Sequence, residues 1–456
     1  MTTDPYVLAV DQGSSGTKVA VFDGAGTLLA HAARRTVVAH PEVVAAEADP
    51  RTWWDALVEA VRQVLETVPA ERIGAVGFTG FMHTVVPATA NGDVAGPTLL
   101  WPDQRPLADA DGKHHPGVER VRWSRREDPA AAVRWYLPVK DYLRFRLTGT
   151  ARTDHYEAGG TGFLDRPGGD WSAEAAGYAG VDIGAFPALG APTDLAGTVT
   201  PEAARATGLR AGTAVVTGTG DWMATLLGAN AVLPARACVY LGTAGVAGGF
   251  ASPAAAAALT EPVCFAAATA TGSAVDWSAG LLGVAGAADL AARAAQAPAG
   301  ARGVTFLPHL MGERGNGSRP HARGALLGLT LAHTQADVAR AVLEGTALWL
   351  RAIAGDDLAA RDPAEIVAVG GGARSEVWLR ILAAVLGRDL AVPAVTEAAL
   401  LGAALIAARG TGMPADPGEW VRTARTVPAE PELVKTYAAR FDEFRAIERR
   451  FAGAEG

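Results

Sequence analysis

The chain has 456 residues, a formal net charge of −8, and 49% hydrophobic and 19% charged residues. This length predicts two or three domains, and an acidic chain without a basic run argues against nucleic-acid binding. No uninterrupted apolar run of about 18 residues occurs and the N-terminus lacks a signal-peptide pattern, so we expect a cytoplasmic protein with no membrane partner. Cys238 and Cys264 each lie in an apolar run, which favours two buried, reduced thiols.

The first strong pattern is a β-hairpin near the N-terminus. Two short apolar runs flank the polar sequence DQGSSGTK, residues 11–18. Its glycines permit positive φ and close backbone approach, and successive N–H groups of such a turn bind anions, with Ser14, Ser15 and Lys18 as further donors. Asp11, at the strand end, suits a hydrated Mg²⁺. The turn is therefore a candidate phosphate site; an ordinary Gly/Ser hairpin with a surface lysine is the alternative.

A third strand is expected over residues 27–33, and a helix begins at the sequence ADPRTWW. Asp49 is a good N-cap and Pro50 suits the first helical position. The apolar residues of this helix are expected on one face: Trp54, Leu57, Val58, Val61, Val64, Leu65 and Val68. A strand over 73–78 follows. Three strands, a helix and another strand predict a mixed sheet covered by helices.

Candidate ligand residues follow this strand, where ligands gather in open α/β sheets. His83 can hydrogen-bond a polar substrate beside Met82; a core histidine satisfied by backbone, with Met82 as packing, is the alternative. Trp101 and Asp103 end the next short apolar run and offer an aromatic wall and a hydroxyl acceptor. For these two residues, a buried tryptophan and a loop salt bridge are the alternative.

The middle of the chain leads to a single carboxylate. A helix over 138–147, a loop and strand over 153–165, and a short helix over 200–208 precede a strand at 214–217. Asp221 and Trp222 follow at the start of another helical stretch. A carboxylate after a Gly-rich turn is either an N-cap or a general base that a hydroxyl can reach, and position alone favours the cap.

The strand–turn–strand pattern of the N-terminus returns more than 200 residues later. Apolar runs at 237–241 and 246–250 flank Gly242, Thr243 and Ala244. The repeat indicates a duplicated fold with one anion-binding hairpin in each half, which together clamp the phosphates of a nucleotide.

The remaining elements continue this alternation of helices and strands. Helices are expected over 279–295, 334–353, 377–386, 398–409 and 431–452, and strands over 304–307 and 366–369. The last of these strands runs into Gly370, Gly371 and Gly372. Such a triplet lets a flat ring or a phosphate lie against backbone; close helix–strand packing is the alternative.

Taken in order, these segments resemble the FGGY family of carbohydrate kinases, and its xylulokinases most. The motifs are DQGSSGTK, FTGFMHT, LLWPDQR, LPVKDYLRFRLTG, TDHYEAGGTGFLD, GTGDWMA, LGTAGV, GALLGLTLAHTQADVARAVLEG and GGGARSEVW. Each motif is short, but their common order over nearly the whole chain is specific. The resemblance implies an α/β fold of two ribonuclease-H-like (actin-like ATPase) domains, residues 1–230 and 231–456, with ATP in an inter-domain cleft.

Residue by residue, the resemblance implies roles for both domains. The implied ATP-binding residues are Ser14, Ser15, Lys18, Gly242, Thr243, Gly272, Gly371 and Gly372. The residues implied on the sugar side are Met82, His83, Trp101, Asp103 and Trp222. Asp11 is implied to act through Mg²⁺. Asp221 matches the catalytic carboxylate, which accepts the proton of a sugar hydroxyl as that oxygen attacks the γ-phosphoryl group.

Three features depart from the family pattern. The second phosphate turn reads GTAG where the family usually has GTSG, so Ala244 lacks a hydroxyl and we expect a contact weaker by about 1 kcal/mol. Trp222 stands where xylulokinases usually carry Asn, and a large indole should reshape the pocket. The segment 105–123 is shorter than in typical members, so the pocket is more open or another segment fills it.

We therefore predict an ATP- and Mg²⁺-dependent kinase for a ketopentose such as D-xylulose. Gluconate and short polyols such as glycerol or erythritol are alternatives within the family, although glycerol kinases usually carry Arg-Glu where this chain has Met82 and His83. An actin-like nucleotide-binding module without sugar kinase activity is the alternative from another class. The sequence leaves the oligomeric state open, with a homodimer as one option.

Overall fold

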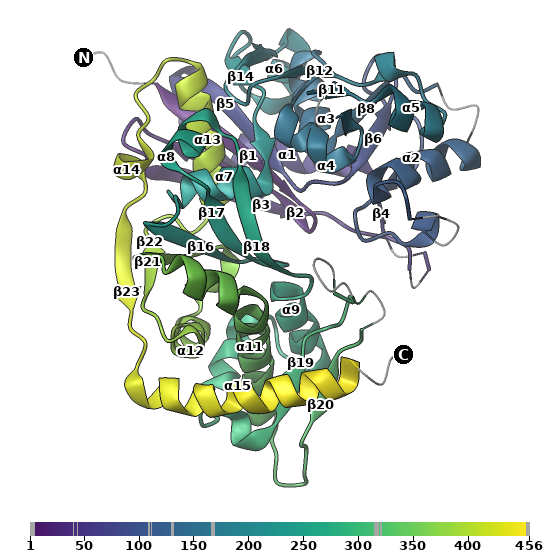
Figure 1. Cartoon of the computed structure of the whole chain (residues 1–456). Helices are drawn as coiled ribbons and strands as arrows, with labels where there is room; N and C mark the ends of the chain where they lie inside the picture. Colours follow the sequence, from purple (N-terminus) through teal and green to yellow (C-terminus); the bar gives the residue numbers. More distant parts are fainter. Residues whose placement is uncertain are drawn as a thin grey trace. The chain divides into compact units, whose positions relative to one another are not determined.

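The computed structural model describes residues 5–39, 41–42, 44–107, 110, 112–128, 132–165, 169–313, 319 and 322–452. The chain divides into two compact units, shown in Figure 1. The first unit consists of Met1–Gly228 and Ala399–Trp420, and the second unit of Ala229–Ala398 and Val421–Gly456. The first unit therefore includes a segment from the C-terminal part of the chain, whereas the expected domains, 1–230 and 231–456, are each continuous in sequence.

The first unit is built on a mixed seven-stranded sheet. Its order is β13–β14–β5–β1–β2–β3, and β15 also pairs with β5. The strands are β1 (Tyr6–Gly13), β2 (Gly16–Phe22), β3 (Leu28–Arg35), β5 (Ile73–Gly80), β13 (Leu195–Thr198), β14 (Ala214–Val216) and β15 (Thr219–Gly220). β1 runs antiparallel to β2 and parallel to β5. β14 and β15 also run parallel to β5. The carboxyl ends of β1, β5 and β15 consequently meet at one edge of the sheet.

Helix α1 (Pro50–Leu65) begins as predicted, because the Asp49 side chain accepts a hydrogen bond from the Arg51 N–H. The predicted apolar face packs against the core, Trp54 included, but the prediction omits Trp53, the most buried tryptophan of the helix. Trp53 is buried, with its ring at a T-shaped angle to that of Phe81 at 5.8 Å, whereas Trp54 is only half-buried. Adjacent tryptophans differ by 100° around the helix, so the apolar pattern alone left this rotation undecided.

The other helices of the first unit complete its layers. They are α2 (Pro116–Glu127), α3 (Val139–Thr148), α4 (His155–Thr161), α5 (Ala173–Ala179), α6 (Pro201–Thr207), α7 (Asp221–Gly228), α13 (Ala398–Gly410) and α14 (Pro417–Trp420). Short strands lie between them: β4 (Glu47–Ala48), β6 (Val85–Ala88), β7 (Thr98–Leu99), β8 (Trp135–Pro138), β9 (Arg152–Asp154), β10 (Leu164–Asp165), β11 (Asp170–Trp171) and β12 (Ala188–Gly190). The predicted loop at 153–165 is wrong, because α4 forms there with Asp154 as its N-cap.

The second unit contains a six-stranded sheet in the order β18–β17–β16–β21–β22–β23. Its strands are β16 (Arg236–Leu241), β17 (Gly245–Phe250), β18 (Pro262–Ala268), β21 (Glu365–Val369), β22 (Leu390–Pro393) and β23 (Thr423–Val427), with β19 (Thr305–Leu307) and β20 (Ala325–Leu327) forming a separate pair. β16 is antiparallel to β17 and parallel to β21. This repeats the arrangement of β1, β2 and β5, so the predicted duplicated α/β fold is confirmed.

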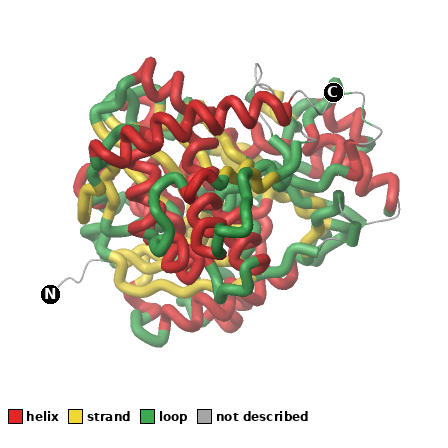
Figure 2. The backbone as a smooth tube through the Cα atoms, turned by 90° about the horizontal axis from the view of Figure 1, so that it is seen from below, coloured by secondary structure: helices red, strands yellow, loops and turns green. Residues whose placement is uncertain are grey.

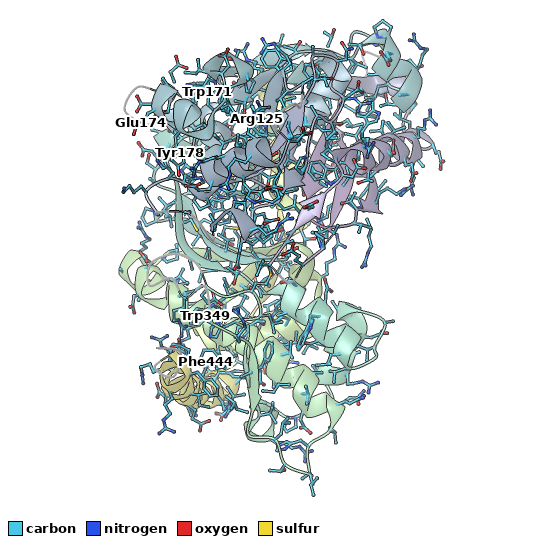
Figure 3. All side chains as sticks on the ribbon, turned by 90° about the vertical axis from the view of Figure 1, so that its right-hand side faces the viewer. Arg125, Trp171, Glu174, Tyr178, Trp349 and Phe444 are labelled. Atoms are coloured by element: carbon cyan, nitrogen blue, oxygen red, sulfur yellow. The ribbon has the colours of Figure 1, made fainter. Side chains whose placement is uncertain are left out.

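Helices α11 (Gln335–Arg361), α12 (Glu376–Leu386) and α15 (Pro431–Ala452) pack together in the second unit. α15 is the yellow helix of Figure 1 and the long red helix that ends at the C label in Figure 2. Trp349 of α11 and Phe444 of α15 belong to one hydrophobic core and are labelled in Figure 3. α11 begins near its predicted start, with a capping box of Thr334 and Asp337, but it continues to Arg361, beyond the predicted end at 353.

Two expectations for the second unit are wrong. The single helix predicted over 279–295 is instead α9 (Gly272–Leu281) and α10 (Ala287–Ala294), separated by Gly283 and Gly286 with φ of 65° and 154°; a short helix α8 (Pro253–Ala258) precedes them. Cys238 is buried as expected, but Cys264 is exposed because β18 is an edge strand of the sheet. Among the helices of the described residues, none combines the length and apolar character needed to cross a lipid bilayer.

Candidate functional site

The sheet topology of the first unit brings separate polar segments to one edge. Asp11 of β1 pairs in register with Thr79 of β5, and Thr79 pairs with Thr219 of β15. Ser14 then follows the end of β1, and Asp221 follows the end of β15 as the first residue of α7. Parallel pairing therefore places two carboxylates near each other although 210 positions separate them in the sequence.

Asp221 is electrostatically coupled to Asp11. Burial raises the pKa of Asp221 to about 7, and the negative charge of Asp11 raises it as well. Its Oδ1 accepts a hydrogen bond from the Trp222 N–H at 2.8 Å. An N-cap side chain instead accepts from the second or third helical N–H, so this contact does not have the N-cap geometry that sequence position favoured. A carboxylate with a pKa near neutrality matches a general base.

The same two carboxylates fit the donor set of Mg²⁺. This ion binds proteins through one or two carboxylates and completes its shell with water and phosphate oxygens. Asp11 is buried, and its charge and that of Asp221 repel each other at this edge, which a divalent cation would relieve. Among the described residues, no cluster of three or more His, Cys, Asp or Glu side chains could hold a metal ion by itself.

The first hairpin turn is tighter than its sequence indicated. The strands extend through Gly13 and resume at Gly16, with Asp11 paired opposite Lys18, so only Ser14 and Ser15 form the turn. The predicted positive φ is wrong for both glycines. Gly16 is required for another reason: an added Cβ would clash with the backbone carbonyl oxygen of Arg34 on β3.

Met82 and His83 lie just beyond β5 and differ in their surroundings. Met82 is buried. A Cβ added to Gly160 would lie 2.7 Å from the Met82 Cε, and a Cβ added to Gly220 would lie 2.5 Å from the Met82 Sδ. Met82 therefore packs tightly between α4 and β15. His83 is exposed, not a core histidine, and its φ is 66°. Its Nδ1 donates to the Gly160 carbonyl oxygen at 2.7 Å, since a carbonyl only accepts.

Asp103 forms the loop salt bridge that was the alternative to its predicted sugar contact. It is fully buried, and its Oδ2 accepts from the Ala46 N–H at 2.9 Å and from Arg105 Nη2 at 2.6 Å. Its Oδ1 accepts from the backbone N–H and Nε of Arg105 at 3.1 and 3.2 Å. The expectation of a hydroxyl acceptor is thus corrected: both oxygens bind the protein itself, and Arg105 also bonds Glu47.

Trp101 and Trp222 are both half-buried. The Trp101 carbonyl oxygen accepts a hydrogen bond from Arg120. The indole Nε1 of Trp222 is buried without a hydrogen-bond partner, beside Asp221. An unpaired buried N–H costs free energy, so the Trp222 indole is available to donate to a bound hydroxyl.

A buried ionic network beneath the site was missed by sequence reasoning. Lys140 and Asp154 are fully buried, 3.1 Å apart, and Lys140 also contacts Asp141 at 2.8 Å. Lys140 Nζ donates to the Thr217 carbonyl oxygen at 3.3 Å, and the Thr219 hydroxyl donates to Asp154 at 2.8 Å. The network therefore fixes the segment that precedes Asp221. The available signal was a Lys-Asp pair inside the otherwise apolar LPVKDYL motif.

Glu157 of α4 is the unpaired member of this region. It is 1% exposed, and neither carboxyl oxygen has a hydrogen-bond partner. An added Cβ at Gly220 would lie 3.1 Å from its Oε2, so the carboxyl group is next to the residue that precedes Asp221. Burial raises the pKa of Glu157 well above its ordinary value, with further increases from Asp154, Asp141 and Asp221. The positive charge of Lys140 opposes part of this increase in pKa.

In the second unit, the second hairpin turn lies on the start of α9. The Gly272 N–H donates to the Gly242 carbonyl oxygen at 2.8 Å, and the N–H groups of Thr271 and Ser273 both donate to the Thr243 carbonyl oxygen at 3.1 Å. An added Cβ at Gly272 would clash with the Gly242 carbonyl oxygen. Three predicted ATP-binding residues, Gly242, Thr243 and Gly272, are therefore in direct contact.

The glycine triplet lies at the same sheet edge as this turn. β16 and β21 are parallel and Tyr240 pairs with Val369, so both strands end there. Gly370 has φ of 90°, and its added Cβ would lie 2.8 Å from the Leu241 carbonyl oxygen. Gly372 is required by close packing on Leu241, whereas an added Cβ at Gly371 would meet open space. Packing explains two of these glycines and leaves Gly371 unexplained.

Both family models of one kinase family match the chain. The model for the FGGY family of carbohydrate kinases, N-terminal domain, matches residues 6–111 and 113–228, and that for the C-terminal domain matches residues 213–411. The chain belongs to the FGGY family of carbohydrate kinases. It is therefore a carbohydrate kinase, a phosphotransferase with an alcohol group as acceptor, and the family resemblance seen in its motifs is confirmed.

Individual relatives extend this assignment. The chain is 32% identical to the xylulose kinase of Escherichia coli (strain K12) over 417 residues, 84% of this chain and 85% of the relative. It is 25% identical to a gluconokinase of Bacillus subtilis (strain 168), covering 89% and 88%. The solved xylulose kinase from Rhodospirillum rubrum has a TM-score of 0.77 at 29% identity, covering 98% and 99%. The gluconate kinase from Lactobacillus acidophilus, at 23% identity and a TM-score of 0.82 over 98% of each chain, shows the shared fold.

Proposed function

We propose that this kinase transfers the γ-phosphoryl group of ATP to a hydroxyl of a ketopentose such as D-xylulose, with Asp221 as the general base. The observation that carries the proposal is the electrostatic coupling of Asp221 to Asp11 at one sheet edge, where the pKa of Asp221 rises to about 7. At and above that pH, ionised Asp221 accepts the proton of the sugar hydroxyl as its oxygen attacks phosphorus.

The proposed ATP contacts come from both units. In the first unit, Ser14, Ser15 and Lys18 bind phosphate oxygens, and Asp11 holds Mg²⁺, which neutralises phosphate charge when bound. In the second unit, the proposed contacts are Gly242, Thr243, Gly272, Gly371 and Gly372. The cleft between two domains, expected from the sequence, stays a prediction.

The proposed acceptor site consists of Met82, His83, Trp101 and Trp222. Met82 forms a packed wall, and the His83 ring and Trp222 indole are the polar groups that meet sugar hydroxyls. D-Xylulose is the first candidate because relatives at 32% identity are named xylulose kinases. Gluconate is the second candidate, because a gluconokinase also covers most of the chain.

The test is ADP release by the full chain with MgATP and a panel of ketoses, polyols and aldonates. D-Xylulose is expected to give the highest kcat/KM. Asp221→Ala is expected to lose about 10²–10⁴-fold in kcat while its nucleotide affinity, measured by calorimetry, stays within about threefold. If no acceptor stimulates ADP release by the wild type, the result favours the alternative of a nucleotide-binding module without sugar kinase activity. If Asp221→Ala keeps its turnover, the general-base assignment is wrong.

Trp222 provides a separate test of acceptor choice. Replacing this indole by Asn removes bulk beside Asp221 and leaves a smaller hydrogen-bonding group. We expect Trp222→Asn to change the relative kcat/KM values across the panel several-fold, toward those of xylulokinases that carry Asn. Identical relative values in both proteins would exclude Trp222 from the acceptor site.

A further inference from the structure

Helix α2 contributes an arginine to the region of the proposed acceptor site. Arg120 is 4% exposed, and its Nη1 donates to the backbone carbonyl oxygen of His83 at 3.3 Å. Its Nη2 donates to the backbone carbonyl oxygen of Trp101. One guanidinium thus connects two chain segments, one following β5 and one following β7, that carry two of the proposed sugar-binding residues.

His83 needs such support because its backbone is strained. A φ of 66° is uncommon for residues with a side chain and costs free energy unless surrounding contacts maintain it. The His83 ring is held by the Gly160 carbonyl oxygen at 2.7 Å, and its own carbonyl oxygen is held by Arg120. The orientation of the His83 side chain is therefore set from α4 on one side and from α2 on the other.

The chemistry of this contact depends on a guanidinium group. Its planar fork directs several N–H donors along fixed axes, so one side chain can satisfy two carbonyl oxygens at a defined separation. A lysine ammonium at the end of a flexible chain keeps the charge but not this geometry. Arg120 also lines one small cavity together with His83 and Leu99, and with Gly117 and Val121 of its own helix.

The rest of α2 provides the rigid base that such a role requires. Val118 and Val121 share a hydrophobic cluster with residues of α5, in the part of the first unit where Figure 3 labels Arg125, Glu174 and Tyr178. Arg122, one position removed from Val121, contacts Tyr178 at 2.8 Å and Glu119 at 3.6 Å on this side of the helix. Within the described part of the chain, the Arg122 side chain contacts Tyr178 and Glu119 and none of the proposed acceptor residues, which makes it a matched control.

We propose that Arg120 is a positioning residue for the acceptor sugar: by holding the carbonyl oxygens of His83 and Trp101, it sets the spacing of their two side chains and so the choice of acceptor. This inference rests on the proposed function, in which those side chains meet the sugar. It also gives Arg120, in the part of α2 that overlaps the short segment 105–123, a part in shaping that site.

The experiment compares Arg120→Met, Arg120→Lys and the control Arg122→Met with the wild type, using the full chain and the best acceptor of the panel. KM for the acceptor and KM for ATP are measured separately, together with kcat. We expect Arg120→Met to raise the acceptor KM about tenfold or more and to change the relative kcat/KM values across the panel, with the ATP KM within about twofold. Arg120→Lys should raise the acceptor KM by a smaller factor than Arg120→Met, and Arg122→Met should have the KM values of the wild type.

Several results would overturn the inference. One is an unchanged acceptor KM and unchanged acceptor ranking in both Arg120 variants; another is an equal rise of acceptor KM in Arg122→Met, which would indicate a general effect on α2. A parallel rise in ATP KM would also contradict it. If Arg120→Met does not fold, Arg120→Lys, which retains charge and most of the volume, decides the matter. A wild type without any acceptor-dependent ADP release would instead refute the proposed function itself.

Discussion

The two units contain the same strand pattern but place different chemistry at its end. In each, a hairpin has its first strand parallel to a later strand: β1 with β5, and β16 with β21. At this edge the first unit carries charged side chains, Asp11, Lys18 and Asp221. The second unit carries the Thr243 hydroxyl and backbone groups of glycines. The proposed function therefore assigns acid–base and metal chemistry to one copy of the duplicated framework, and nucleotide recognition through close backbone approach to the other.

The support behind each edge differs in the same way. In the first unit, the ion pair of Lys140 and Asp154 holds the segment before Asp221 through hydrogen bonds to Thr217 and Thr219. In the second unit, close contacts that only glycine permits bring Gly272 onto Gly242 and Gly372 onto Leu241. Substitutions in the first unit should consequently affect catalysis and its pH dependence, and substitutions in the second unit should affect nucleotide binding.

The largest effect is expected at the carboxylate pair of the first unit. Asp11→Asn removes the proposed Mg²⁺ ligand, and we expect kcat to fall by about 10²-fold or more, with the Mg²⁺ concentration for half-maximal rate increased. Loss of the Asp11 charge also lowers the pKa of Asp221, because that charge raises it in the wild type. The acid limb of the residual pH–rate profile should therefore move to lower pH. An unchanged Mg²⁺ requirement would contradict the assignment.

The pKa of Asp221 also predicts a pH-dependent stability. The folded chain binds this proton with a pKa of about 7, whereas an unfolded Asp has a pKa of about 3.9, so the stability contributed by protonation is present below about pH 4 and lost as the pH rises through 7. Asn cannot ionise. Asp221 is only half-buried, so the effect of its full pKa shift is reduced by solvent screening. Asp221→Asn should therefore be more stable than the wild type by roughly 1–2 kcal/mol at pH 8 and equal at pH 4.

Thermal or urea unfolding without nucleotide measures this difference. The matched control is Asp103→Asn, which breaks the buried ion pair with Arg105 and should destabilise the chain at pH 8. A stability difference for Asp221→Asn that is the same at both pH values would show that ionisation of Asp221 is not its cause.

For the second unit, two glycines of α9 separate nucleotide binding from stability. An added Cβ at Gly272 clashes with the Gly242 carbonyl oxygen, whereas at Gly280 it meets nothing within 4 Å. Gly272→Ala should raise the ATP KM about tenfold and leave the acceptor KM unchanged. Gly280→Ala should leave both KM values unchanged and stabilise the chain by about 0.5–1 kcal/mol through helix propensity. Equal ATP KM values in the two variants would remove Gly272 from the proposed site.

The smallest expected effect concerns the missing hydroxyl of the second turn. Ala244→Ser adds a donor beside Thr243, and one net hydrogen bond of about 1 kcal/mol corresponds to an approximately fivefold lower ATP KM. The acceptor KM should not change. Calorimetric titration with an ATP analogue gives the affinity directly, and equal affinities would mean that the Ala244 position does not reach the phosphates.

The sequence by itself determined the local elements and the identity of the main candidate residues. Apolar runs around polar turns identified both hairpins, and the capping residue Asp49 located α1, because these signals depend on neighbours in the chain. The ordered motifs identified the family. Local signals were insufficient where competing contacts decide the result, as with the burial of Trp53 on α1, the helix α4, and the exposure of Cys264 on an edge strand.

Only the tertiary structure decided what each candidate residue contacts. Asp103 and Asp221 are both single carboxylates, the first after a short apolar run and the second after a Gly-rich turn. Asp103 has its oxygens bonded to Ala46 and Arg105, whereas Asp221 lies near Asp11 with a raised pKa. The parallel pairing of β1, β5 and β15 causes that difference, since it joins segments far apart in the sequence. Burial and charge separation depend on such pairings, and for this reason the pKa of Asp221 and the contacts of Arg120 required the folded chain.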